Sequence, residues 1–243
     1  MTYYMNWIKS LFSGKVIAGI TIVLICTSVL LALPQKSLKK DKHMYSYLAL
    51  GDSYTIGEQV SSQDNFPNQT VSLLKKKHVE VGTPVIIATT GWTTDELAAS
   101  IREHNIVDKF SIVSLLIGVN NQYRGRSVEN YREELEQLVN QAIGFADGHP
   151  EHVFVLSIPD WGVTPFAEDR DRHKIALEID AYNAAKKEIV LAHKCHYIDI
   201  TESTRKNGAD EEYLVEDRLH PSGKEYAIWA EQLAAEIESQ LKK

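Results

Sequence analysis

The sequence predicts an α/β fold in which a parallel, five-stranded sheet is covered by helices on both faces. From about Met44 onward, strand-like and helical stretches alternate five times. The strand-like runs are mostly apolar on both sides, which is typical of parallel strands buried between two helical layers. Of the 243 residues, 44% are hydrophobic and 24% are charged, a globular composition sufficient for one such domain. A repeated strand-helix-strand order therefore predicts a parallel sheet.

The five expected strands are short and rich in β-branched and aromatic residues, which favours strands over helices. They are YSYLAL (45–50), PVIIATT (84–90), FSIVSLLIG (110–118), HVFVLSI (152–158) and CHYIDI (195–200).

Longer stretches between and after these runs have helical character. In the clearest of them, Tyr131, Leu135 and Leu138 recur at helical spacing, and Ser127 followed by Asn130 resembles a helix entry. The expected helices cover about 66–77, 93–105, 127–146, 172–194 and 222–243.

The segment Val16–Leu33 differs from the rest of the chain, because its 18 residues carry no charge. As a helix it would span roughly 27 Å, close to the hydrocarbon thickness of a bilayer. We expect a transmembrane anchor or uncleaved signal segment, between a short tail (1–15) and a basic linker (34–43), with the folded domain at 44–243. A cleaved signal peptide is the alternative, although LLALPQKS offers no convincing small-x-small cleavage site.

The orientation of this segment follows from two opposing signals. The lysine count on the two sides favours a cytoplasmic domain, whereas a short amino-terminal tail before a signal-like run favours the opposite. We expect a membrane-anchored protein whose folded domain is extracytoplasmic, or a secreted one if the segment is cleaved. The lysines before the run are Lys9 and Lys15, and those after it are Lys36, Lys39, Lys40 and Lys42.

Charge and composition argue against several classes of partner. A net charge of -7 and a pI near 5.7 leave no basic surface for a phosphate backbone, so nucleic acid is not expected as a partner. Two cysteines are too few for a disulfide framework. No metal or other cofactor is expected, since these histidines show no metal-ligand spacing: His149, His152, His173, His193 and His196.

Polar residues and glycines follow the strands at the edge where α/β sheets bind ligands. Ser53 comes after the first strand, Gly91 after the second and Asn120 after the third, and Asp217 and His220 precede the last helix. Taken singly, each of these has a simpler reading, such as a turn, a helix cap or a surface ion pair. Their joint placement at successive strand ends indicates a serine hydrolase.

Each residue type has a chemical reason to be there. A serine hydroxyl becomes a useful nucleophile when an imidazole takes its proton and a carboxylate fixes the tautomer of that imidazole. Ser53, Asp217 and His220 supply these groups, in an order along the chain that is a known solution to this geometry. The backbone N–H groups of Ser53 and Gly91 and the side chain of Asn120 could hold the oxyanion.

Four short motifs together resemble the SGNH, or GDSL-type, esterase and lipase family. They are GDSYTIGE, a glycine after the second strand, GVNN and DRLHPS, and the resemblance covers about position 45 to the end. It implies a flavodoxin-like, three-layer α/β/α sandwich, the SGNH hydrolase fold. It also implies that Ser53 is nucleophile and oxyanion donor, that Gly91 and Asn120 complete the oxyanion hole, and that His220 is the base oriented by Asp217.

The sequence departs from the family pattern at two positions. Tyr54 stands where the family often has leucine, and Asn121 stands where aspartate is common. Neither departure removes a catalytic group, but Asn121 bears on how the neighbouring amide is supported.

The expected activity is hydrolysis of a carboxylic ester through an acyl-enzyme, without a cofactor. A small acyl ester or acyl-glycan competes with a lysophospholipid or thioester as substrate. The alternative from another class is a membrane-tethered carbohydrate- or lipid-binding module with an inert triad. Trp92, Trp161 and Phe166 follow strands at the active edge, where substrate binding and aromatic packing are equally open.

Overall fold

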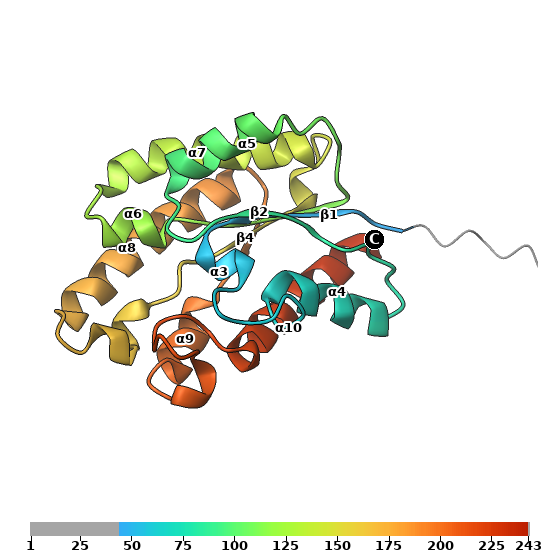
Figure 1. Cartoon of the computed structure of the whole chain (residues 1–243). Coiled ribbons are helices and arrows are strands. Elements are labelled where there is room, and N and C mark those ends of the chain that lie inside the picture. Colours follow the sequence, from blue (N-terminus) through green and yellow to red (C-terminus); the bar gives the residue numbers. More distant parts are fainter. Residues whose placement is uncertain (1–43, 243) are drawn as a thin grey trace, which may run out of the picture. The chain divides into compact units, whose positions relative to one another are not determined.

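Five parallel strands form the central sheet in the order β2-β1-β3-β4-β5 (Figure 1). The computed structural model describes residues 44–242, so the predicted tail, membrane segment and linker (1–43) lie outside the described residues. The strands are β1 (Tyr47–Gly51), β2 (Val85–Ala88), β3 (Ile112–Leu116), β4 (Val153–Leu156) and β5 (His196–Ile198). Each lies within a predicted strand run or ends one residue beyond it, and the predicted parallel sheet is confirmed.

Helices cover both faces of the sheet, as predicted. In Figure 1, α5, α7 and α8 lie on one face, and α4 and α10 pack together on the other. The bounds are α3 (Ser53–Ile56), α4 (Phe66–Lys76), α5 (Thr94–His104), α6 (Val119–Tyr123), α7 (Val128–Phe145), α8 (Arg172–Ala192), α9 (Thr201–Asn207) and α10 (Gly223–Leu241). Short 3-10 turns are η1 (Pro150–His152), η2 (Trp161–Val163), η3 (Pro165–Ala167) and η4 (Glu211–Tyr213).

Local side-chain bonds fix where the longer helices begin. The hydroxyl of Ser127 accepts the N–H of Asn130 at 3.2 Å, so the predicted entry to α7 is confirmed. At the start of α5, the carboxylate of Glu96 accepts the N–H of Thr93 at 2.9 Å. Both contacts satisfy backbone donors that have no partner inside the helix. Within residues 44–242, no helix combines the length and apolar character needed to span a bilayer.

The order of the strands explains where a ligand site can form. The chain passes from β1 to β2 on one side and then crosses to β3 on the other side of β1. Gly51, the last residue of β1, pairs with Ala88 and Leu116, so three strand ends are level at this edge. A side chain at position 51 would meet the Thr55 hydroxyl and the Leu116 carbonyl oxygen at 2.1 and 2.4 Å. Glycine therefore lets the chain turn closely into α3.

Candidate active site

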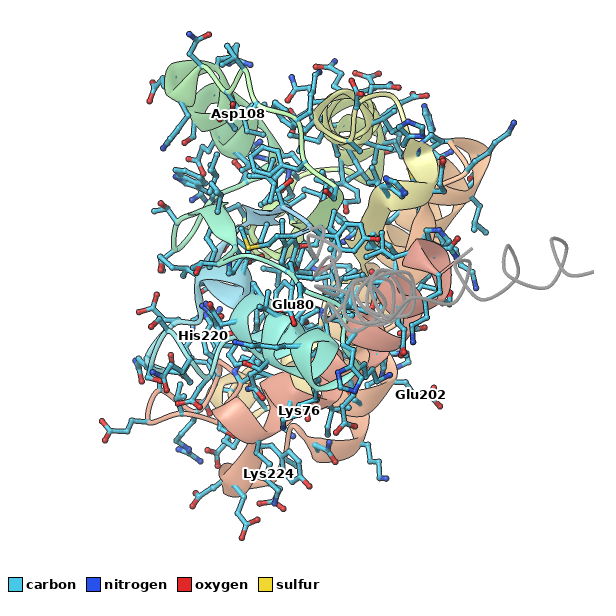
Figure 2. All side chains as sticks on the ribbon, turned by 90° about the vertical axis from the view of Figure 1, so that its right-hand side faces the viewer. Lys76, Glu80, Asp108, Glu202, His220 and Lys224 are labelled. Atoms are coloured by element: carbon cyan, nitrogen blue, oxygen red, sulfur yellow. The ribbon has the colours of Figure 1, made fainter. Side chains whose placement is uncertain are left out.

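A continuous chain of hydrogen bonds joins three of the predicted site residues. The Oγ of Ser53 lies 2.9 Å from Nε2 of His220, and Nδ1 of His220 lies 2.6 Å from Oδ2 of Asp217. Figure 2 shows His220 close to the light-blue ribbon of α3, which begins at Ser53. A carboxylate beside Nδ1 favours the tautomer with its proton on Nδ1, which leaves Nε2 free to accept the serine proton.

Ser53 is placed by the tight turn between β1 and α3. Asp52 precedes it as the helix cap, and its Oδ1 accepts the N–H of Tyr54 at 3.0 Å. The hydroxyl of Ser53 is thus carried at the first position of a short helix, next to the β1–β3 switch point. Tyr54 is buried, and its ring centroid lies 5.2 Å from that of His220. The departure at Tyr54 therefore supplies packing beneath the imidazole.

His220 and Asp217 lie in the loop before α10, which is tied back on itself. The N–H of Val215 donates to the carbonyl of His220 at 2.9 Å, and Leu214 forms an isolated bridge with Pro221. The second carboxylate oxygen of Asp217 accepts the backbone N–H groups of Leu219 and His220, both at 2.9 Å. The carboxylate is consequently held by the same loop that carries the imidazole.

The hydrogen bonds to Asp217 lower the pKa of its carboxyl group by more than partial burial raises it. Burial opposes ionisation, but bonds from the His220 ring and from the N–H groups of His220 and Leu219 favour it. The net result is a pKa of Asp217 below its usual range. The group beside Nδ1 is therefore a carboxylate at neutral pH, as charge stabilisation of an imidazolium requires.

Three candidate oxyanion donors border one cavity. Ser53, Gly91 and Asn120 all line it. Among the described residues, no protein acceptor is assigned to the N–H of Ser53 or of Gly91. The amide of Asn120 donates one hydrogen to the carbonyl of Trp92 at 2.9 Å, which leaves its second amide hydrogen for a ligand. Gly91 has φ of +85°, a conformation that glycine adopts without strain.

The cavity has a volume of about 210 Å³ and is walled mainly by apolar side chains. Trp161 and Phe166 both line it, whereas Trp92 is not among its lining residues. Trp92 is partly buried and packs against the hydrophobic core. The lining consists of Ser53, Tyr54, Thr90, Gly91, Val119, Asn120, Tyr123, Trp161, Phe166, Leu219 and His220.

Two residues that follow the GVNN motif shape the cavity and were not predicted. Tyr123 is half exposed, and its ring meets that of Trp161 edge-on with centroids 5.4 Å apart. Gln122 accepts the indole N–H of Trp161 at 2.8 Å and donates to Glu178 of α8 at 2.7 Å. Their contribution depends on α6, a helix of five residues that is too short to be predicted from periodicity.

Asn121, which follows Asn120, makes its contacts inside the protein and not in the cavity. Asn121 is fully buried, its Oδ1 accepts the N–H of Thr94 at 3.1 Å, and its Nδ2 donates to the Thr94 hydroxyl at 2.6 Å. It thus joins α6 to the start of α5. The two adjacent amides face different surroundings, Asn120 the cavity and Asn121 the protein interior.

Two ionisable groups are buried beneath the site. Burial raises the pKa of Asp52 to about 7, although the Tyr54 N–H and the charge of Lys186 act in the opposite direction. Burial lowers the pKa of Lys186 to about 7, and its amine donates to the Leu156 carbonyl at 2.7 Å. Both side chains are fully or almost fully inaccessible to solvent. Each charge is thus costly in this setting, and the charge of each favours ionisation of the other.

Within residues 44–242, no group of three or more His, Cys, Asp or Glu side chains is arranged to hold a metal ion.

Several solved structures are similar to this chain. A lipase/acylhydrolase from Enterococcus faecalis is 22% identical with a TM-score of 0.64, covering 81% of this chain and 96% of that one. An acetylxylan esterase from Geobacillus stearothermophilus is 19% identical with a TM-score of 0.64, covering 79% and 94%. The psychrotrophic esterase EstA from Pseudoalteromonas sp. is 14% identical with a TM-score of 0.60, covering 82% and 100%. These likenesses show a shared fold.

Sequence comparison identifies the family. A search of curated protein sequences found no significant match. The family model described as GDSL-like Lipase/Acylhydrolase family matches residues 49–228, which include the end of β1, all of β2 to β5 and the whole Ser53–His220 hydrogen-bond chain. The chain therefore belongs to the GDSL-like lipase/acylhydrolase family and is a serine esterase or lipase.

Proposed function

We propose that this chain hydrolyses carboxylic esters with Ser53 as nucleophile, His220 as general base and acid, and Asp217 as the group that orients the imidazole. The observation that carries the proposal is the hydrogen-bond chain from Asp217 through His220 to Ser53, which ends at the wall of the cavity. Membership of the family supports the same reaction class.

The geometry supports a two-step reaction. Oγ of Ser53 attacks the ester carbonyl carbon while Nε2 of His220 takes its proton. The resulting oxyanion accepts hydrogen bonds from the N–H of Ser53, the N–H of Gly91 and the free amide hydrogen of Asn120. His220 then protonates the leaving alcohol, and the acyl group remains on Ser53. Water, deprotonated by His220, releases the acid and restores the serine hydroxyl.

The size of the cavity favours a short acyl group. A volume of about 210 Å³ is below the roughly 300–1,000 Å³ of pockets that enclose drug-sized ligands. The wall is closed on one side by Trp161, which is almost fully buried and held by Gln122. Small acyl esters, including O-acylated glycans, fit this space better than lysophospholipids. A fold neighbour described as an acetylxylan esterase is consistent with this choice.

A panel of esters tests the proposal. With p-nitrophenyl esters from acetate to dodecanoate, we expect kcat/KM to be highest for the short acyl groups and to fall as the chain lengthens. An acetylated sugar and a lysophospholipid, matched in concentration, compare the two leaving-group classes. A maximum at dodecanoate or with the lysophospholipid would reject the short-acyl assignment. Ser53→Ala protein serves as the control for background hydrolysis.

We also propose that the predicted segment Val16–Leu33 tethers the domain outside the cytoplasmic membrane. Its support is the charge-free run of spanning length near the amino terminus. Protease added to cells with a permeabilised outer layer should digest the domain. Protection of the domain would place it inside, and a soluble form beginning near Gln35 would mean that the segment is a cleaved signal.

A further inference from the structure

We propose that Arg124 is a positioning residue for the oxyanion site, because its guanidinium holds the turn that presents the Gly91 N–H to the cavity. The inference rests on the proposed function of Ser53 and its oxyanion donors. It concerns a residue outside the cavity lining and outside the hydrogen-bond chain.

The guanidinium joins three parts of the site. Arg124 caps the C-terminal end of α6, the helix that carries Asn120. Its Nη2 donates to the carbonyl of Gly91 at 2.7 Å, and its Nη1 donates to the carboxylate of Glu96 at 3.0 Å. The other carboxylate oxygen of Glu96 accepts the N–H of Thr93, just before α5. Arg124 therefore fastens the Gly91 turn both to α6 and to the start of α5.

The turn needs an external contact to fix the direction of its free N–H. Gly91 lies in the left-handed region and has no side chain, so its own backbone permits many orientations. The peptide that follows Gly91 is held at its nitrogen end by a long bond from Trp92 N–H to Thr89, at 3.3 Å. Arg124 holds the oxygen end of that same peptide at 2.7 Å. The N–H of Gly91 belongs to the preceding peptide, which can turn against this one only about the two bonds at the Gly91 Cα. With the following peptide fixed, the directions open to that N–H are restricted.

A second bond from α6 strengthens this interpretation. Asn120 donates to the carbonyl of Trp92, so α6 binds two successive carbonyl groups of the turn. The bond to Trp92 comes from Asn120, which borders the cavity, and the bond to Gly91 comes from Arg124, which does not. Movement of the turn would thus shift Gly91 relative to Asn120, and both are proposed to contact the same oxyanion.

A purely electrostatic reading of Arg124 leads to a different expectation. The Arg124–Glu96 pair is about two-fifths exposed on both sides, at 44% and 40%, and such pairs contribute little to stability. Arg126 provides a matched comparison, because it pairs with Asp95 on the same helix α5 at 2.6 Å. No bond from the Arg126 side chain to the Gly91 turn is found among the described residues. If Arg124 were only a surface ion pair, the two arginines would be equivalent.

The test compares Arg124→Gln with Arg126→Gln in the full-length protein, using a short acyl ester. For Arg124→Gln we expect kcat to fall about tenfold while KM stays within about twofold, because a displaced oxyanion donor acts in the transition state. For Arg126→Gln we expect both constants to stay within about twofold. Arg124→Lys, which can reach one of the two acceptors, should give an intermediate kcat.

A boronic acid inhibitor gives a readout that a structural role would not change. Such a compound forms a tetrahedral adduct on the serine, so its Ki should rise in Arg124→Gln by the same factor as kcat falls. An equal loss in Arg126→Gln, an unchanged kcat in Arg124→Gln, or a rise in KM alone would overturn the inference. Ser53→Ala, measured in parallel, separates failure of the proposed function from failure of the inference about Arg124. If it retains activity, the proposed function has failed; if it is inactive, only the role of Arg124 is in question.

Discussion

Two adjacent asparagines offer the sharpest test of the oxyanion site, because they carry the same side chain in different surroundings. In Asn120→Ala, the cavity loses one amide donor and the Trp92 carbonyl loses a bond of 2.9 Å. In Asn121→Asp, the cavity is untouched, but one of the two buried contacts with Thr94 changes from donor to acceptor.

The expected magnitudes differ in kind. Removing one oxyanion donor costs about 2.7–4 kcal/mol in the transition state, so Asn120→Ala should lower kcat by about 10²- to 10³-fold. KM should stay nearly constant, because the neutral ester carbonyl is a weaker acceptor than the oxyanion. For Asn121→Asp the carboxylate faces the Thr94 hydroxyl, which donates to Glu134. A buried acceptor without a donor costs about 1–3 kcal/mol of folding free energy.

Steady-state kinetics with a short acyl ester give kcat and KM, and urea unfolding gives the stability of each variant. We expect Asn120→Ala to lose activity with little loss of stability, and Asn121→Asp to lose stability with kcat within about threefold of wild type. If Asn120→Ala raises KM alone, that amide binds the ground state. If folded Asn121→Asp loses as much activity as Asn120→Ala, the wrong asparagine has been assigned.

Three further changes test other parts of the site. Asp217→Asn should lower kcat by about 10²-fold or more, but by less than Ser53→Ala does. The change disturbs the tautomer and charge of His220 and leaves the attacking oxygen in place. Steady-state kinetics of Asp217→Asn and Ser53→Ala decide which variant loses more activity. Gln122→Leu removes the hydrogen bond that holds Trp161 in the cavity wall. We expect the ratio of kcat/KM for the acetate ester to that for a longer ester to fall about 3- to 10-fold. An unchanged ratio would mean that Trp161 is held by packing alone. Burial depresses the folded-state pKa of Lys186 to about 7, so the unfolded chain takes up this proton at a higher pH than the folded protein does. Stability therefore falls as pH drops toward 7 and levels off below it, where the folded amine is protonated too. From pH 8 to pH 6, Lys186→Met should therefore gain about 1 kcal/mol in unfolding free energy relative to wild type. Urea unfolding at the two pH values measures this, and a difference between variant and wild type that is the same at both would contradict the prediction.

The strands and long helices could be predicted from the sequence because their signals are local. Each of the five strands falls in or next to an apolar run, and helices such as Val128–Phe145 show apolar periodicity and a capping serine. The short helices α3, α6 and α9 have four to seven residues and were not predicted. Such pieces are too short for periodicity and depend on contacts with the rest of the fold.

The convergence of the site residues followed from topology. Parallel strands end at one edge, so residues that follow β1, β2 and β3 must lie near one another. The aromatic wall was harder to predict, because side-chain direction after a strand depends on the backbone of each loop. Trp92 packs against the core, whereas Tyr123 reaches the cavity from a helix that was not predicted. The Arg124 contact to Gly91 likewise depends on the position of α6.

The central claim is that Ser53 is the nucleophile, and labelling with a fluorophosphonate tests it directly. Attack of Oγ on phosphorus expels fluoride and leaves a phosphonyl adduct, which peptide mapping by mass spectrometry locates. We expect a single adduct on Ser53 of the full-length protein, no labelling of Ser53→Ala, and slow labelling of His220→Ala, in which the neighbouring base is missing. Absence of labelling in folded wild-type protein, or an adduct on another residue, would contradict the assignment and favour an inert binding module or a different nucleophile.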